Sequence, residues 1–239
     1  MTLDDFSNGF DTLLNSFARG VVLEEPLSKL DIKLDEYEKS VYLTKSQEDI
    51  VLSLYTGRNA ALKGFEETEE LRRYLASLVK EDSIDPESSG TTPTGMEANS
   101  KFFTLPSDLW FITYESVSIS GAACEGLTSL EVVPVRQDEY HKIRKNPFRG
   151  PNNRRALRLD LGDDVVEIVS KYTVTRYYIR YLSKLKPIIL TDLSDGLSIE
   201  GISTATPCEV HESLHRRILE QAVLMALQDR KIQAPQQSK

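Results

Sequence analysis

The stretch VHESLHRRILEQAVLMALQDR, residues 210–230, is a long periodic segment against which the upstream residues have to pack. Pro207 precedes it, and Glu209 and Glu212 put negative charge where the N-terminus of a helix favours it. The apolar residues recur at intervals of three and four, which places them on one face of an α-helix: Val210, Leu214, Ile218, Ala222 and Met225. We predict an amphipathic helix of about six turns here.

The same stretch contains a formal match to the zinc-peptidase signature HExxH, in His211, Glu212 and His215. In such peptidases this spacing puts two histidine ligands on one helical face, with the glutamate beside them as general base. One hypothesis is therefore a zinc peptidase in which His211 and His215 bind the metal and Glu212 is the base.

A catalytic zinc site needs a third protein ligand, and the sequence has none in a familiar position. The metzincin pattern continues with a glycine and a third histidine, but Ile218 and Gln221 stand at those two positions. Glu220 and Asp229 belong to the same predicted helix, and His141 lies far upstream. We therefore expect no catalytic residue, no metal and no cofactor, and we expect the two histidines to form hydrogen bonds beside the apolar stripe.

Length and composition indicate a soluble folded protein. The chain has 239 residues, 40% of them hydrophobic, which is enough to bury a core, and its net charge of -8 disfavours indiscriminate binding to nucleic acid or anionic membranes. Cys124 and Cys208 lack a paired spacing, so we expect reduced thiols in a protein made and used in the cytosol. The N-terminal residues are acidic, and no apolar run approaches a membrane-spanning length, so we expect neither a secretory leader nor a membrane partner.

Residues 1–80 are predicted to form an N-terminal helical part. A helix with an apolar side covers residues 1 to about 20, and residues 29–41 are expected to be extended or irregular. Residues 44–47, TKSQ, have capping-box spacing and predict the start of a second helix that stops at Gly57. A third helix is predicted over residues 66–80, with glutamates in its first turns.

The amino-acid composition changes after residue 80. Residues 81–100 are rich in Ser, Thr, Gly, Pro and acids, which predicts a flexible linker. Residues 101–206 are predicted to form a mostly antiparallel β-domain, in which Gly162, Asp163 and Asp164 mark a hairpin. Runs rich in β-branched and aromatic residues predict its strands: 109–119, 129–135, 156–161, 165–170 and 173–182. The C-terminal helix, residues 207–230, should pack on the helical part, and residues 231–239 should be a flexible tail. The predicted class is α+β, with an inserted antiparallel β-domain.

Charge is unevenly distributed along the chain. Residues 1–100 carry ten Lys and Arg against twenty Asp and Glu, whereas residues 136–186 carry thirteen Lys and Arg against six acids. In the last predicted strand, Arg176, Tyr178 and Arg180 alternate with Tyr177, Ile179 and Tyr181, which gives one basic face and one core-like face. A second hypothesis is therefore a DNA-contacting protein of the packaging or replication machinery, although a solvated sheet face or a protein contact explains the same pattern more simply.

Three blocks of sequence suggest a family, and they span most of the chain. The first comprises LDEYEKS (34–40), LTKSQEDIV (43–51) and FEETEE (65–70). The second comprises FTLPSDL (103–109) with Tyr114 and Glu115, followed by NPFR (146–149). The third is CEVHESLHR (208–216) with the helix that contains Ala222. In this order the blocks resemble the head-to-tail ring, or adaptor, proteins of crAss-like tailed bacteriophages.

The resemblance implies a virion structural protein at the head-tail junction and no enzyme. It implies a homo-oligomeric ring of twelve copies, which binds the portal protein and adjacent tail or ring proteins as a connector. Helices would build the ring, the β-domain would project from it, and the genomic DNA would pass through the lumen without specific binding during ejection. It also implies that His211, Glu212 and His215 belong to a structural helix.

Overall fold

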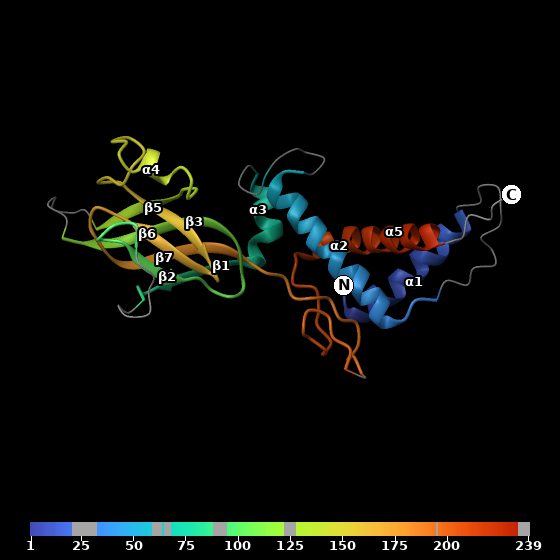
Figure 1. Ribbon diagram of the computed structural model, residues 1–239. Coiled ribbons are helices and arrows are strands. Elements are labelled where there is room, and N and C mark those ends of the chain that lie inside the picture. The colour runs from blue at the N-terminus through green and yellow to red at the C-terminus, as the bar shows by residue number, and fades with distance from the viewer. Residues whose placement is uncertain are drawn as a thin grey trace. The chain divides into compact units, whose positions relative to one another are not determined.

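The computed structural model describes residues 1–20, 33–58, 64, 68–87, 95–121, 128–194 and 196–233 (Figure 1). It divides into two compact units. The helical unit comprises Met1–Leu78 and Leu185–Lys239, and the β unit comprises Val79–Lys184. Helices from both ends of the chain share one unit and the sheet is inserted between them in sequence, so the predicted α+β class is confirmed.

Three long helices build the helical unit: α1 (Leu3–Gly20), α2 (Glu36–Thr56) and α5 (His215–Gln233). Both α1 and α2 pack on α5. A Cβ at Gly9 of α1 would lie 2.8 Å from Cδ2 of Leu219, so the absence of a side chain there permits the close approach of α1 to α5. The core residues that these helices share include Phe6, Phe10, Leu43, Ile50, Ile218 and Val223.

The stripe predicted for the C-terminal helix is largely buried. Val210, Leu214, Ile218 and Ala222 are buried, and Met225 is half-buried. The helix itself starts later than predicted, because a short 3₁₀ turn (Glu212–Leu214) precedes α5. It also ends later, at Gln233, so three residues of the predicted tail are helical and residues 234–239 lie outside the described residues.

The start predicted for the second helix is wrong. Helix α2 begins at Glu36, where Asp35 and Glu38 form a capping box, and it ends as predicted before Gly57, whose φ of 76° is left-handed. Residues 44–47, predicted as the cap, lie inside the helix, where Thr44, Ser46 and Gln47 are buried.

The buried polar face of α2 binds the backbone of the segment that follows the β unit. The side-chain oxygen of Ser40 accepts a hydrogen bond from the Leu190 N–H (3.0 Å), and that of Thr44 accepts one from the Ile188 N–H (3.0 Å). The Gln47 side-chain amide donates to the Lys186 carbonyl (3.0 Å). These bonds satisfy peptide groups that would otherwise be buried without partners, and they hold an extended segment along the helix.

The third helix is shorter than predicted. Helix α3 spans Glu69–Leu75 with Thr68 as its N-cap, and a 3₁₀ turn (Ala76–Leu78) ends it. Strand β1 (Val79–Ile84) follows at once, so the first residues of the predicted linker pair in a sheet instead. The rest of the predicted linker is described only in part, since residues 88–94 lie outside the described residues, as does Cys124.

The β unit is one seven-stranded sheet in the order β1-β7-β3-β4-β5-β6-β2. Its other strands are β2 (Lys101–Thr104), β3 (Leu109–Ser120), β4 (Ser129–Pro134), β5 (Arg155–Gly162), β6 (Val165–Val169) and β7 (Thr173–Ser183). All neighbouring pairs are antiparallel except β4 with β5, whose connection contains the short helix α4 (Tyr140–Ile143). The predicted hairpin between β5 and β6 is confirmed, with Asp163 and Asp164 both at positive φ.

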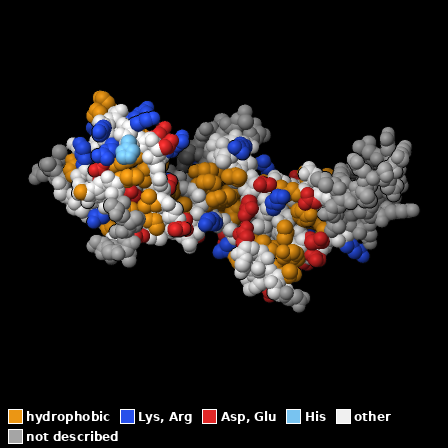
Figure 2. All heavy atoms as spheres, viewed as in Figure 1, with side chains coloured by type: hydrophobic (Ala, Val, Ile, Leu, Met, Phe, Trp, Pro, Cys, Tyr) orange, Lys and Arg blue, Asp and Glu red, His pale blue; other side chains and the backbone are white. Residues whose placement is uncertain are grey.

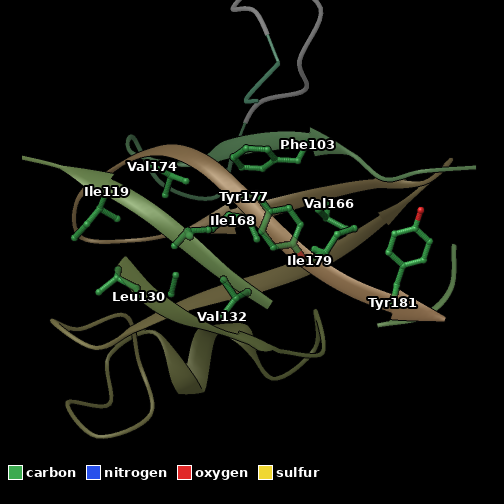
Figure 3. Close-up of a cluster of buried hydrophobic side chains, with 12 residues drawn as sticks. Phe103, Ile119, Leu130, Val132, Val166, Ile168, Val174, Tyr177, Ile179 and Tyr181 are labelled. Carbon is green, nitrogen blue, oxygen red and sulfur yellow. The ribbon is translucent and has the colours of Figure 1, made fainter. Parts of the chain in front are cut away.

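The sheet curls around a cluster of twelve buried side chains, among them Phe103, Val117, Tyr177 and Ile179 (Figure 3). A second, smaller cluster of Tyr140, Leu157, Leu159 and Val169 buries α4 against β5 and β6. Alternation along β5 sends Ala156 to the first cluster and Leu157 to the second. The β unit thus starts at residue 79, where β1 pairs with β7, and ends at residue 184, whereas the sequence predicted boundaries at 101 and 206.

Candidate interaction surfaces

The HESLH segment is built differently from a peptidase helix. His211 is the N-cap of the 3₁₀ turn and His215 is the first residue of α5. A tight turn therefore separates the two histidines, which do not stand four residues apart in one regular α-helix as an HExxH site requires.

His215 is 7% exposed and both of its ring nitrogens have partners. Nε2 donates to the Val210 carbonyl at 2.9 Å, and Nδ1 lies 3.0 Å from the amino nitrogen of Met1. The ring also contacts Phe6, with 5.4 Å between ring centroids. Burial lowers the pKa of His215, so the neutral ring is favoured in this position.

His211 bonds locally. Its Nδ1 accepts from the Ser213 N–H at 3.3 Å and lies 2.6 Å from the Ser213 hydroxyl, and the ring contacts Tyr74. Glu212 is exposed. Across the part of the chain that the structure describes, no three His, Cys, Asp or Glu side chains are grouped so that they could hold a metal ion. The contacts of both histidines stabilise the start of α5.

The alternating face predicted for β7 is present. Tyr177, Ile179 and Tyr181 are buried, whereas Arg176 and Arg180 are exposed and Tyr178 lies between them on the outer side of the sheet. On this outer face the neighbouring strand β3 contributes Tyr114, which stands opposite Arg180 with its ring centroid 5.9 Å from the guanidinium carbon.

Acids in strand β1 and directly after it neutralise the two arginines. Nε of Arg180 lies 2.9 Å from Oε1 of Glu81, and Nε of Arg176 lies 3.0 Å from Oδ1 of Asp85. These partners were not foreseen, because the acids fall in the predicted linker and lie more than ninety residues upstream. A shallow hollow of about 460 Å³ lies on this face, lined by Glu81, Asp82, Ser83, Tyr114, Tyr178, Ile179 and Arg180. The face is therefore mixed in charge, with exposed aromatic rings, and is not a continuous basic surface.

Two carboxyl groups meet on the helical unit. Burial raises the pKa of Glu48 on α2 to about 7, and the hydrogen bond with Glu200 and the charges of Glu200 and Asp49 act in the same direction. Glu200 lies in the turn closed by the bridge between Ile199 and Ile202, and it has a φ of 51°. One proton held between the two carboxyl groups lets them stay close together.

The Glu48 carboxyl makes the stability of the helical unit depend on pH. In the unfolded chain the pKa of this glutamate has its ordinary value of 4.5, whereas in the folded state it is about 7. Between these two pH values the folded state therefore keeps a proton that the unfolded chain has lost. Stability therefore falls as pH rises through that window. We expect Glu48→Gln to melt at a higher temperature than the wild type at pH 8 and at the same temperature at pH 4.

Thermal melts of Glu48→Gln across that pH range, followed by helical circular dichroism, measure this effect. Glu131→Gln, which changes an exposed glutamate of β4, is the control and should leave the pH dependence unchanged. A constant difference between Glu48→Gln and the wild type at every pH would contradict the shared proton.

Among the described helices, none is both long enough and apolar enough to cross a membrane. The similarity of the chain to known proteins runs from end to end. The family model for phage tail ring protein 3/4 matches residues 1–238. The chain is 46% identical over 230 residues to ring protein 3 of Bacteroides phage crAss001, covering 95% of each protein. It is 30% identical over 235 residues to ring protein 4/5 of the same phage, covering 95% of this chain and 92% of that relative.

These matches confirm the resemblance to ring proteins of crAss-like phages. They cover both units and the HESLH segment, so the similarity concerns the whole molecule and not one shared module. By the extent of the model and the identity to its relatives, the chain belongs to the phage tail ring protein 3/4 family.

Proposed function

We propose that this chain is a non-enzymatic structural subunit of a phage virion, that twelve copies close into a ring at the head-tail junction, and that this ring joins the portal protein to the tail. The observation that carries the proposal is the end-to-end match to phage ring proteins. A closed ring needs two different complementary surfaces on each subunit, and the uneven charge of the chain supports such a pair.

The passage of DNA through the lumen is part of the same proposal. The helical unit carries twenty-two Asp and Glu against fifteen Lys and Arg. An acidic lining repels the phosphate backbone, so a duplex can slide along it without binding. The helices are therefore the best candidates for the surface that faces the genome.

The contacts of the HESLH segment support a structural role for these residues. A metal could bind His215 only at a ring nitrogen that already has a partner, either the Val210 carbonyl or the Met1 amino group, and the ring would have to leave a buried position. Nδ1 of His211 is also occupied, because it accepts a hydrogen bond from the Ser213 N–H. We therefore propose that neither histidine binds zinc.

The hypothesis of a DNA-contacting packaging or replication protein receives less support from the geometry. Arg176 and Arg180 are paired with acids, so binding a phosphate there would break existing ion pairs. If these arginines held duplex DNA, binding would weaken steeply with salt, and Arg176→Ala with Arg180→Ala would reduce it. We expect no such salt-sensitive binding that depends on the two arginines.

Native mass spectrometry tests the proposed function, because one spectrum reports both stoichiometry and bound metal. The purified chain is measured alone and after mixing with the portal protein of the same phage. We expect a zinc-free multimer of twelve copies, formed alone or on the portal. A chain that stays monomeric in both samples would refute the proposal, and a monomer with one zinc ion would favour the peptidase hypothesis instead.

A further inference from the structure

The loop between α4 and β5 is tightly held although it projects from the β unit. The Asn146 side-chain oxygen accepts hydrogen bonds from the N–H groups of Phe148 (2.9 Å) and Arg149 (3.2 Å). The Gly150 N–H donates to the Asn146 carbonyl at 2.7 Å. A Cβ at Gly150 would lie 2.7–2.9 Å from three carbonyl oxygens of this turn, so only glycine fits.

Phe148 lies in this loop and is 84% exposed. No other large hydrophobic side chain among the described residues is as exposed, and the next is Tyr114 at 54%. An apolar ring exposed to water is unfavourable, so its burial in an interface would be favourable. Because the loop is already ordered, little conformational entropy would be lost when a partner binds. Aromatic residues presented in this way are typical of the centre of a protein interface.

The surroundings of Phe148 are strongly basic. Residues 140–159 contain seven Lys and Arg and no Asp or Glu. Five of these bases form no ion pair within the described part of the chain: Lys142, Lys145, Arg149, Arg154 and Arg155. Figure 2 shows blue side chains gathered with an orange group around the position of α4, at the upper left. Beside the loop is a hollow of about 350 Å³ whose lining includes Tyr140, Arg144, Lys145 and Lys171.

This surface needs a partner that offers both an apolar contact and negative charge. Duplex DNA provides the charge, but it can bury a phenylalanine only if base steps are unstacked. A protein surface with acids around exposed apolar groups satisfies both requirements directly. The helical unit of this chain is of that kind, because it has an excess of acids and leaves Val41, Leu52 and Leu224 exposed.

We propose that Phe148 and the basic loop around it dock on the acidic helical unit of a second copy of this chain. The inference rests on the proposed ring, in which each subunit joins the next through two different surfaces. Phe148 is the apolar anchor, and the unpaired cations around it draw the acidic surface in and set its orientation. The basic middle of the sequence thus serves the contact between subunits.

Phe148→Ala is the first test, with Tyr114→Ala as the matched control. Both variants remove one exposed aromatic ring from the β unit, and neither ring belongs to its buried clusters. We expect Phe148→Ala to weaken self-association by about 30-fold or more, as loss of an interface anchor does. Tyr114→Ala should associate like the wild type. Sedimentation velocity measures association, and thermal melts verify that both variants remain folded.

Charge is tested separately with Arg149→Glu. At low salt, this variant should associate more weakly than the wild type. High salt should weaken the association of the wild type and reduce the difference between the two proteins. If Phe148→Ala and Arg149→Glu both associate as strongly as the wild type, the proposed contact is wrong. That result would not contradict the proposed ring.

Cross-linking identifies the partner directly. A photoreactive benzoylphenylalanine replaces Phe148 in one preparation, which is mixed with isotope-labelled wild-type chain and, in a second sample, with the portal protein. We expect cross-links to labelled peptides of α1, α2 or α5. Cross-links confined to the portal or to labelled peptides of the β unit would overturn the proposal. A wild-type chain that remains monomeric in both samples would refute the ring as well.

Discussion

Arg158→Ala is expected to lower the free energy of unfolding of the β unit by about 3–5 kcal/mol, because it leaves a buried carboxylate without its counter-charge. Nη1 of Arg158 lies 2.8 Å from Oε1 of Glu115, and the two side chains are 11% and 9% exposed. The Tyr177 hydroxyl donates to the other oxygen of Glu115 at 2.6 Å. Glu115 therefore depends on partners that reach it from β5 and β7.

The charges of this pair explain the size of the effect. Burial raises the pKa of Glu115, and the positive charge of Arg158 and the Tyr177 hydrogen bond offset that rise in part. Burial by itself would lower the pKa of Arg158, but Glu115, Tyr177 and Asp160 together outweigh it and raise the pKa above its usual range. Without Arg158, the carboxyl would have to take up a proton or admit water, and either change costs stability.

Two further variants test whether the loss of stability in Arg158→Ala comes from the buried ion pair. Arg176→Ala removes a surface ion pair whose side chains are 47% and 70% exposed, and it should cost less than about 1 kcal/mol. Glu115→Leu combined with Arg158→Met replaces the pair with apolar side chains and should recover most of the lost stability.

Urea unfolding followed by fluorescence measures these differences, because the single tryptophan of the chain, Trp110, lies in β3 and reports on the β unit. Equal losses for Arg158→Ala and Arg176→Ala would contradict the buried ion pair.

Ile218→Ala is expected to destabilise the helical unit by about 2–5 kcal/mol, the usual result of emptying a filled core position. Ile218 is fully buried in α5, and its carbonyl accepts a hydrogen bond from the Ser46 hydroxyl of α2 at 2.7 Å. Close packing on two sides leaves little room for neighbours to collapse into the cavity.

Leu224→Ala is the matched control on the same helix. Leu224 is 47% exposed, so the same kind of truncation should change stability by about 0.5 kcal/mol or less. Urea unfolding followed by helical circular dichroism distinguishes the two variants. A similar effect of both would mean that the predicted stripe of α5 does not form the core of the helical unit.

Features set by neighbouring residues could be predicted from the sequence. The three- and four-residue spacing in residues 210–230 predicted the buried stripe of α5, and alternation in residues 176–181 predicted the two faces of β7. Gly57 and the pair Asp163 and Asp164 marked a helix end and a hairpin, because their backbone conformations depend on local sterics. The family, too, was recognisable from the order of its sequence blocks.

Features set by distant partners could not be predicted. The capping-box pattern at residues 44–47 was misleading, because those polar side chains are buried in α2, where Thr44 and Gln47 bind backbone groups about 140 residues downstream. Arg176 and Arg180 suggested a basic surface, but Asp85 and Glu81, directly after and in β1, neutralise them.

The tertiary structure also determined the contacts of the two histidines in the HExxH match and the exposure of Phe148. His215 is a polar residue but is buried, in contact with Phe6 and hydrogen-bonded to the Val210 carbonyl. Phe148 is an apolar residue but is exposed, in a loop whose turn requires Gly150. Local periodicity and turn chemistry act between residues a few positions apart, so a sequence contains them directly. Burial and charge neutralisation depend on which distant segments meet, and only the folded chain brings those segments together.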